Sequence, residues 1–257
     1  MILNGKPVAQ KIYSSINFEK PPTLAVILVG EDPASLTYIK VKEKILENLG
    51  ITFKLFHLPG FSRETKILEL VEDLNKNKFI DGIVVQLPLP ADLNTKKILA
   101  AILPHKDIDG FSGEFMPPTI QAILEILNYY KISYENKNIV IVGHGLLVGK
   151  PLEEFLIKKG IKPIICDSET SDLKSKTLEA DILISGAGAT GLIKPEMVKS
   201  DATIIDAGTA ESNGEMVGDV DPKVYEKVKA YTPVPGGVGP VTVACLMRNL
   251  VEAARQS

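Results

Sequence analysis

The sequence predicts an α/β protein with two domains, each built around a parallel sheet. Short apolar segments rich in β-branched residues alternate with helical patterns along almost the whole chain, an order typical of βαβ units. Glycine and proline close many of these segments. The chain has 257 residues, a length that suits two small domains or one large one.

The first half contains three expected strands, each followed by an expected helix. Ser35 and Ser62 are candidate N-caps for two of the helices, and Gly50 is a candidate C-cap. The expected strands are Thr23–Val29, Ile51–Leu58 and Ile80–Gln86, and the expected helices run from Ser35 to Leu49, from Ser62 to Asn77 and from Thr95 to Leu103.

The second half repeats this order, and no flexible linker separates it from the first. We therefore expect a domain boundary inside ordered structure near residue 120, with residues 1–118 forming an α/β/α domain and residues 119–240 a second domain. The last helix, within residues 241–257, would return to the first domain. The expected strands are Asn138–Val142, Pro163–Cys166, Asp181–Ser185 and Ala202–Asp206, and the expected helices are Ile120–Tyr130, one that starts near Val148, and Val241–Arg255.

Composition argues against several classes of protein. Apolar residues make up 45% of the chain and charged residues 24%, and the net charge is -3 with both signs mixed, so neither nucleic acid nor a membrane is an expected partner. Cys166 and Cys245 form no C-x-x-C pair, and the first residues lack the apolar core of a signal peptide. We expect a cytoplasmic protein.

A glycine turn follows one of the expected strands in the second half. The strand runs directly into Gly143, His144 and Gly145, and a helix is expected to start soon afterwards. This order predicts a Rossmann-type dinucleotide cradle, in which glycines admit a pyrophosphate to the free N–H groups of the helix start. The spacing is G-x-G-x-x-x-G, which differs from the usual G-x-G-x-x-G. The alternative is a turn that only packs a helix on a sheet.

Two acidic residues follow the next expected strand. Asp167 lies 24 residues after Gly143, where an acid can accept hydrogen bonds from ribose hydroxyls, and Glu169 adds a second negative charge. Together they would repel a ribose 2′-phosphate, so NAD is expected over NADP. The alternative is that both acids are solvated loop residues.

Candidate chemical groups also occur in the first half. Tyr38 and Lys42 are four residues apart and share one helix face, although a solvated helix surface is the alternative. Gln86 ends a buried strand immediately before Leu87 and Pro88. Ligands bind at the carboxyl ends of parallel strands, so Gln86 is either a strand cap or a ligand contact.

Two loops add further candidates. Asp107 and Asp109 lie in one loop, but no nearby His or Cys supports a metal site, and a single carboxylate that binds a heterocyclic N–H is the simpler interpretation. The loop 232–240 holds three prolines and three glycines before the last helix, so it is either a structural turn or a stiff surface that presents backbone groups.

Together, these segments resemble the bifunctional methylenetetrahydrofolate dehydrogenase/methenyltetrahydrofolate cyclohydrolase (FolD-type) family over essentially the whole chain. Four ordered signatures carry the resemblance, which makes it far more specific than any single motif. They are Val29–Ser35 with Tyr38 and Lys42, Gln86–Pro90, Lys106–Phe111, and Pro233–Pro240 with Thr242.

The resemblance implies oxidation of 5,10-methylenetetrahydrofolate with NAD or NADP and hydrolysis of the methenyl product to 10-formyltetrahydrofolate. It also implies a tetrahydrofolate derivative as substrate and a homodimer formed through the cofactor domain. The implied catalytic residues are Lys42 as general acid/base, Gln86 to position Lys42 and water, Tyr38 against the folate rings and Asp109 as pterin anchor. The other residues implied to contact the substrate are Leu87, Pro88, Pro235, Gly236 and Gly237. The residues implied to bind the cofactor are Gly143, His144, Gly145, Asp167, Ser168 and Thr209.

Three segments depart from the pattern of this family. The usual G-R-S at the cofactor turn is Gly143-His144-Gly145, and the usual C-H-S-R/K-T is Cys166-Asp167-Ser168-Glu169-Thr170, so both changes remove positive charge and favour NAD. The usual P-C-T-P is Pro117-Pro118-Thr119-Ile120, and the stretch before it is shorter than in the family. The resemblance therefore does not define the shape of the substrate cleft.

Three alternative functions are compatible with parts of the sequence. One is another two-domain dehydrogenase such as shikimate dehydrogenase, although the Q-L-P-L-P and P-G-G-V-G-P segments argue against it. A second is a monofunctional NAD-dependent dehydrogenase, against which Lys42 and Gln86 argue. A third is a non-catalytic folate- or nucleotide-binding protein, which would bind ligand without turnover.

Overall fold

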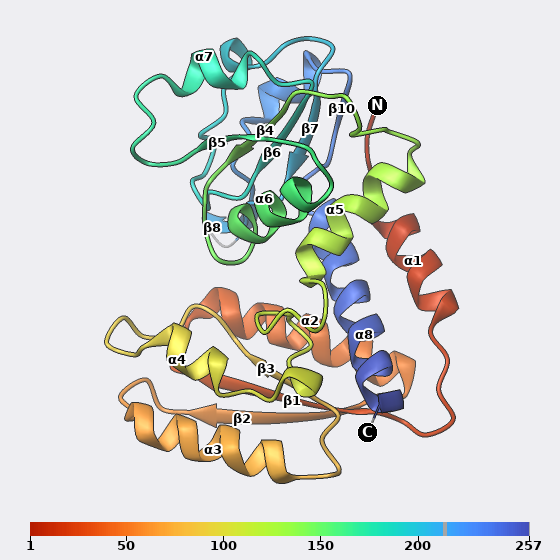
Figure 1. The fold of residues 1–257 in the computed structure, drawn as a ribbon, viewed down its shortest axis with the longest axis vertical. Helices are drawn as coiled ribbons and strands as arrows, with labels where there is room; N and C mark the ends of the chain where they lie inside the picture. The colour runs from red at the N-terminus through yellow and green to blue at the C-terminus, as the bar shows by residue number, and fades with distance from the viewer. Residues whose placement is uncertain (213–214, 257) are drawn as a thin grey trace. The chain divides into compact units, whose positions relative to one another are not determined.

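The computed structural model describes residues 1–212 and 215–256, which form two compact units (Figure 1). The three-stranded unit comprises Tyr13–Pro118 and Leu246–Ser257, and the five-stranded unit comprises Met1–Ile12 and Thr119–Cys245. Each unit is named here for its main sheet, and every pair of neighbouring strands in both main sheets is parallel. The expected α/β class is therefore confirmed.

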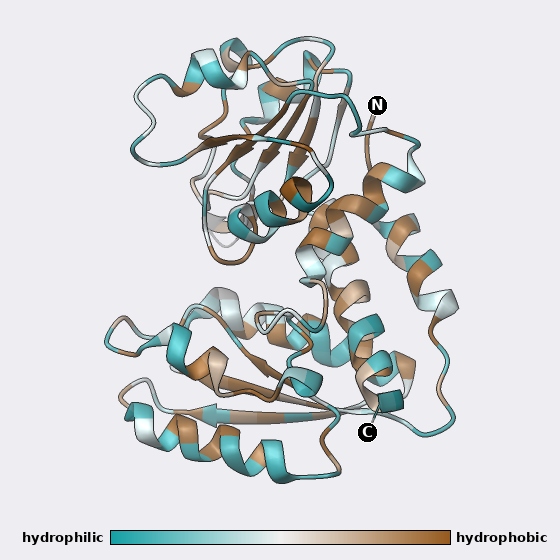
Figure 2. Cartoon of the chain, in the orientation of Figure 1, coloured by the Kyte–Doolittle hydropathy of each residue, from teal (hydrophilic) through white to brown (hydrophobic). Residues whose placement is uncertain are grey.

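The three-stranded sheet has the order β2-β1-β3, with β1 (Thr23–Val29) in the centre. β1 pairs with β2 (Thr52–Leu58) on one side and with β3 (Gly82–Val85) on the other. The central strand is apolar from its second residue onwards because helices cover both of its faces. β2 carries polar residues and is more exposed, as suits an edge strand (Figure 2).

Alternate residues of β1 pack against different pairs of helices. One face meets α2 (Pro33–Leu49) and the C-terminal half of α8 (Val238–Gln256), and the other meets α3 (Glu64–Lys76) and α4 (Thr95–Ala100). The first face of β1 presents Leu24, Val26 and Leu28, and the second presents Ala25, Ile27 and Val29. A one-residue shift in register would exchange these two sets of contacts.

The five-stranded sheet has the order β10-β7-β6-β4-β5. The chain moves from β4 to β5 in one direction and then returns to the other side of β4 for β6 and β7. Such a reversal places a ligand crevice at the carboxyl end of β4. The strands are β4 (Ile139–Val142), β5 (Ile164–Cys166), β6 (Ile182–Ser185), β7 (Thr203–Asp206) and β10 (Ala230–Tyr231).

Shorter elements complete the chain. The remaining helices are α1 (Gly5–Ser15), α5 (Pro118–Tyr129), α6 (Gly149–Lys158) and α7 (Leu173–Thr177). The 3-10 turns are η1 (Pro104–Lys106), η2 (Pro195–Met197) and η3 (Pro222–Glu226). An antiparallel hairpin is formed by β8 (Ala210–Ser212) and β9 (Glu215–Val217). The sequence reading missed α1, α7 and this hairpin. α1 buries Val8, Ala9 and Ile12, a helical spacing too short to stand out from its surroundings.

Two helix caps and several element boundaries differ from expectation; the last helix, for example, begins at Val238 and not at Val241. Asp32, not Ser35, caps α2, because its side chain accepts a hydrogen bond from the Ser35 N–H and Pro33 takes the first helical position. α3 begins at Glu64 after Arg63, and Ser62 makes no cap. The helix expected to reach Leu103 ends at Ala100, and a 3-10 turn follows.

The first twelve residues group with the five-stranded unit by their contacts, whereas the sequence analysis placed them in a domain of residues 1–118. Leu3 N–H donates to the Tyr231 carbonyl at 2.7 Å, and Gly5 N–H donates to the Gly236 carbonyl at 2.8 Å. Gly5 must be glycine, because a Cβ there would overlap the Gly237 carbonyl oxygen. The segment is thus fixed by backbone contacts that no local pattern reveals.

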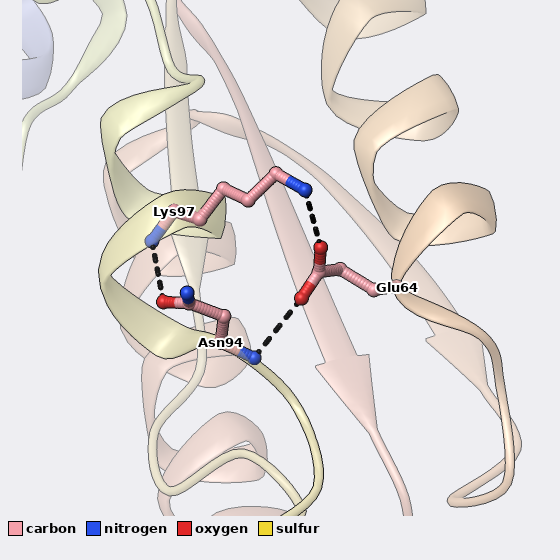
Figure 3. A network of polar contacts seen from close by, with 3 residues as sticks. All are labelled: Glu64, Asn94 and Lys97. Atoms are coloured by element: carbon pink, nitrogen blue, oxygen red, sulfur yellow. Dashed lines mark hydrogen bonds and ion pairs between the residues drawn. The ribbon is translucent and has the colours of Figure 1, made fainter.

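A polar network fixes the loop that follows β3 (Figure 3). The Glu64 carboxylate accepts a hydrogen bond from Asn94 N–H at 3.1 Å and forms an ion pair with Lys97 Nζ at 2.6 Å. The Asn94 side chain in turn caps α4 by accepting from Lys97 N–H at 3.1 Å. The start of α3 therefore holds the far end of the loop that begins at Gln86.

The loop 107–116 is also tightly held, and it contains two glycines with positive φ. Gly110 has φ +78°, and a Cβ there would lie 2.4 Å from the Phe115 carbonyl oxygen. Gly113 has φ +86°, but a Cβ there would meet nothing within 4 Å. The buried Asn249 side chain of α8 donates to the carbonyls of Ile108 at 2.9 Å and Met116 at 3.1 Å.

This difference gives a matched test of how the loop is packed. Gly113→Ala should lower the free energy of unfolding by about 1 kcal/mol, the cost of a left-handed backbone. Gly110→Ala should lower it by about 3 kcal/mol, because a backbone clash adds to the same cost. Urea unfolding of both variants measures the difference, and equal losses would contradict the close packing at Gly110.

Candidate active site

The centre of the candidate site is a buried lysine. Lys42 lies on α2, and its side chain is only 5% exposed. Its Nζ lies 4.8 Å from the centroid of the Tyr38 ring, one helical turn away, and 3.1 Å from Oε1 of Gln86. The solvated-helix alternative for Lys42 is therefore wrong, whereas Lys40 and Lys44 on the same helix are exposed.

Gln86 is oriented by the chain around it. Its backbone N–H continues the sheet by donating to the Ile27 carbonyl at 2.9 Å, and its side-chain Nε2 donates to the Leu87 carbonyl at 2.9 Å. Ser35 Oγ donates to the same carbonyl at 3.4 Å. Because Nε2 donates to Leu87, Oε1 of Gln86 is the atom that accepts the hydrogen bond from the Lys42 amine. Leu87 and Pro88 follow in a cis peptide.

Asp109 approaches this pair from the loop after η1. Lys106 fixes the start of this loop, because its Nζ donates to the carbonyls of Leu74, Asn75 and Asn77 at 2.8–3.1 Å. These carbonyls lie at the C-terminal end of α3, where a cation is favourable. The loop is thus held from α3 and, through Asn249, from α8.

The electrostatics of these groups are coupled. Burial lowers the pKa of the Lys42 ammonium below its ordinary value, and the nearby Asp109 carboxylate opposes this shift. Burial raises the pKa of Asp109 to about 6, against the effect of Lys42 and with that of Asp107. Burial and Asp109 raise the pKa of the Tyr38 hydroxyl, which stays protonated at neutral pH.

This arrangement can carry out proton transfer. An amine with a lowered pKa offers a larger neutral fraction at neutral pH than an exposed lysine does, and a neutral amine can accept a proton. Gln86 fixes the position of that amine, while Asp109 remains ionised at pH 7 and can bind a polar N–H group of a ligand. The sequence-predicted residues Tyr38, Lys42, Gln86 and Asp109 are therefore brought together.

The glycine turn of the five-stranded unit fits a dinucleotide. Gly143 has φ +91°, and a Cβ there would lie 2.7 Å from the backbone N of Ala187. A Cβ on Gly149, at the start of α6, would lie 2.0 Å from the Gly143 carbonyl oxygen. A Cβ on Gly145 would meet nothing within 4 Å, and no side chain caps α6. Open space beside an uncapped helix start suits a pyrophosphate.

Acidic groups adjoin two of the segments that the sequence analysis assigned to the cofactor. His144 Nε2 lies 2.6 Å from Oε2 of Glu153, so its ring is paired with a carboxylate of α6. Asp167 and Glu169 are exposed, as Ser168 is, and the Asp167 Oδ1 accepts from Glu169 N–H at 3.0 Å in a local turn. Asp167 thus shapes its own loop while its carboxylate remains at the surface.

The remaining predicted residues lie in the five-stranded unit. Thr209 is exposed after Gly208, in the loop that follows β7. Pro235 is exposed after a cis peptide, Gly236 has φ +106°, and Gly237 is buried against Pro233. Pro235–Gly237 therefore belongs to the five-stranded unit, in contrast to Tyr38, Lys42, Gln86 and Asp109.

Comparison with known proteins supplies the family. A family model for the tetrahydrofolate dehydrogenase/cyclohydrolase catalytic domain matches residues 3–109, and one for the NAD(P)-binding domain of the same family matches residues 117–257. The chain belongs to the tetrahydrofolate dehydrogenase/cyclohydrolase family. Among curated members of this family, the bifunctional protein FolD of Aquifex aeolicus is 41% identical over 278 residues, which span 100% of this chain and 96% of the relative.

Solved structures agree with membership of the tetrahydrofolate dehydrogenase/cyclohydrolase family. The bifunctional FolD enzyme of Campylobacter jejuni is 36% identical, with a TM-score of 0.91 and coverage of 100% of this chain and 99% of that one. The Trypanosoma brucei enzyme, solved with NADP and an inhibitor, is 29% identical with a TM-score of 0.92, over 100% and 97% of the two chains. A shikimate dehydrogenase from Thermus thermophilus is 15% identical with a TM-score of 0.58, which shows a related fold alone.

Several buried polar residues near the sites were missed in the sequence reading. Lys106 and Asn249 hold the loop that carries Asp109, and Asp206 and Asp219 are buried in the five-stranded unit. Asp206 stands out as the acid that ends an apolar strand, but most of the groups bonded to Asp206 and Asp219 lie 13 or more residues away in sequence. Among the described residues, no group of three or more His, Cys, Asp or Glu is placed to hold a metal, and no helix is long and apolar enough to cross a membrane.

The geometry predicts a selective loss in Lys42→Met. Removal of the amine should reduce hydrolysis of 5,10-methenyltetrahydrofolate by about 1000-fold, the middle of the range for loss of a general acid/base. Methionine preserves the apolar stem and has no charge to desolvate, so the melting temperature should not fall. Lys40→Met, on the exposed face of α2, is the matched control. Hydrolysis in Lys42→Met at the rate of Lys40→Met would contradict the role of the buried amine.

Proposed function

We propose that this chain oxidises 5,10-methylenetetrahydrofolate with a nicotinamide cofactor and hydrolyses the 5,10-methenyl product to 10-formyltetrahydrofolate. The observation that carries the proposal is the buried Lys42 amine, 3.1 Å from Gln86, in a chain that belongs to the dehydrogenase/cyclohydrolase family. Lys42 and Gln86 supply a positioned base, which a dehydrogenase alone would not need. This pair favours the bifunctional function over a monofunctional dehydrogenase or a binding protein.

The first step requires positioning more than proton transfer. Asp109 would bind the polar N–H groups of the pterin, and Tyr38 would pack against the ring system, with Leu87 and Pro88 beside it. When bound, the nicotinamide ring supplies the acceptor for the hydride that leaves the one-carbon bridge. Gly143, His144, Gly145, Asp167, Ser168 and Thr209 would hold the cofactor.

The second step uses Lys42 as a base. Water adds to the cationic methenyl carbon and gives one proton to the neutral amine of Lys42. The bond from this carbon to N5 then breaks: the hydroxyl group of the adduct loses its proton to become the formyl C=O, N5 takes up one proton, and the one proton left over passes to solvent. Gln86 would keep the amine in place and orient the water. The cationic substrate also disfavours a charged lysine beside it, which increases the neutral fraction of the amine.

The acidic surroundings of the cofactor turn support NAD as the preferred cofactor. Asp167 and Glu169 would repel a 2′-phosphate, and the His144 ring, which replaces a family arginine, is already paired with Glu153. The family model matched here covers NAD(P)-binding domains, so both cofactors are compatible with family membership.

An assay of methylenetetrahydrofolate oxidation with NAD and with NADP tests both parts of this proposal. The kcat/KM for NAD should exceed that for NADP, and methenyl intermediate should not accumulate.

In the double variant Asp167→Ser/Glu169→Arg the cofactor preference should shift toward NADP by about tenfold or more, because a new cation meets the 2′-phosphate. Glu196→Arg/Asp201→Ser, at two exposed positions with the same total change of charge, controls for net charge. Equal or better use of NADP by the unmodified chain would contradict the NAD preference, and accumulation of methenyl product would contradict retained hydrolysis.

We propose a homodimer in the cytoplasm as the working form of the protein. Support comes from the family resemblance and from exposed Leu146, Leu147 and Ile157, which surround the start and end of α6 in the five-stranded unit. Light scattering on the purified chain measures this state, and a monomeric mass at micromolar concentration would contradict it.

A further inference from the structure

Two aspartates are buried together at the carboxyl end of the five-stranded sheet. Asp206 ends β7 and is 1% exposed, and Asp219 follows β9 and is 0% exposed. Asp206 accepts hydrogen bonds from the N–H groups of Gly208 at 3.0 Å, Asp219 at 3.2 Å and Val220 at 3.0 Å. A buried carboxylate persists only where donors compensate for lost solvation, and here backbone N–H groups from two separate loops do so.

Asp219 makes short bonds to the loop that follows β6. Its Oδ2 accepts from Ser185 Oγ and from Ala187 N–H, both at 2.7 Å, and its Oδ1 accepts from Ala189 N–H at 2.7 Å. One carboxylate thus fixes three donors spread over five consecutive residues. Gly208 adjoins it so closely that a Cβ there would lie 2.2 Å from the carboxyl carbon of Asp219.

The loop held by Asp219 forms one wall of the glycine turn. Gly186 N–H donates to the Val142 carbonyl at 2.8 Å, so the loop is bonded to the last residue of β4. A Cβ on Gly143 would lie 2.7 Å from both the backbone N and the Cα of Ala187, which places the two backbones in direct contact. Any displacement of Ala187 therefore changes the space in which the turn at Gly143–Gly145 sits.

We propose that Asp219 is a positioning residue for nicotinamide cofactor binding, which it serves by holding the 185–189 loop against the glycine turn. The proposal rests on the proposed function in one respect, that the glycine turn binds NAD or NADP. Asp219 touches no ligand in this role. Its carboxylate bonds to the loop after β6 and packs closely against Gly208, which directly precedes Thr209, so the loops that follow β6 and β7 meet at one carboxylate.

The test is Asp219→Asn, which retains size but replaces one acceptor oxygen with an NH₂ group. An amide can serve either the Ser185 and Ala187 donors or the Ala189 donor, and its NH₂ then faces a donor that it cannot satisfy. We expect the Kd for NAD⁺, measured by calorimetry on the full chain without folate, to rise about tenfold, as loss of a charge-assisted bond implies. The KM for NAD⁺ should rise in parallel, while nucleotide-free hydrolysis of methenyltetrahydrofolate should stay within about twofold of normal.

Two further variants keep the result decisive. Asp221→Asn changes a more exposed carboxylate two residues away, which is bonded to Lys194 and to Lys223 N–H, and should leave the Kd unchanged. Ser185→Ala keeps the Asp219 charge and two of its three bonds, and should raise the Kd by about threefold with a normal melting temperature. This variant decides the matter if Asp219→Asn does not fold.

An unchanged Kd in Asp219→Asn, or in Ser185→Ala where the first variant does not fold, would overturn the proposal. A parallel loss of nucleotide binding, hydrolysis and melting temperature in both variants would also overturn it, because Asp219 would then support the fold in general. Calorimetry uses no folate, so an unmodified chain that binds NAD⁺ but does not turn over methylenetetrahydrofolate would refute the proposed reaction without affecting this inference.

Discussion

The burial of the Lys42 ammonium group is the constraint around which the three-stranded unit is organised. A charged amine removed from water is stable only where fixed groups replace its hydration. Gln86 supplies an acceptor at 3.1 Å, the Tyr38 ring lies 4.8 Å away, and Asp109 supplies a compensating charge. These groups come from α2, the end of β3 and the loop after η1, so the register of the sheet and the anchoring of that loop both affect the pKa of one amine.

The five-stranded unit corresponds to the NAD(P)-binding domain of the family, and it has few cations near the glycine turn to bind the negatively charged pyrophosphate of a dinucleotide. Backbone N–H groups at the uncapped start of α6 are the available donors, and glycines at 143 and 149 allow the close approach of backbone segments around them. Carboxylates then serve two purposes. Buried Asp206 and Asp219 fix loops, whereas exposed Asp167 and Glu169 would, in the proposed function, repel a ribose 2′-phosphate.

Patterns that depend on neighbours in sequence were predictable, and those that depend on distant partners were not. The strand from Thr23 to Val29 was recognised because all its residues but the first are apolar, and Gln86 stood out as a polar residue at the end of such a strand. The proximity of Gln86 to Lys42 was implied only by family resemblance. The roles of Lys106 and Asn249 were not predicted, because their acceptors lie about 30 and 140 residues away and no local spacing encodes such contacts.

The pKa of Lys42, measured by NMR titration of ¹³C-labelled lysine side chains, tests the central claim most directly. The resonance absent from Lys42→Met identifies the residue, and the account predicts that it titrates below the ordinary value of 10.5, because burial outweighs the attraction of Asp109. In Asp109→Asn the titration should move to still lower pH, because the opposing charge is gone. A Lys42 resonance that titrates at or above 10.5, and does not respond to Asp109→Asn, would contradict the account.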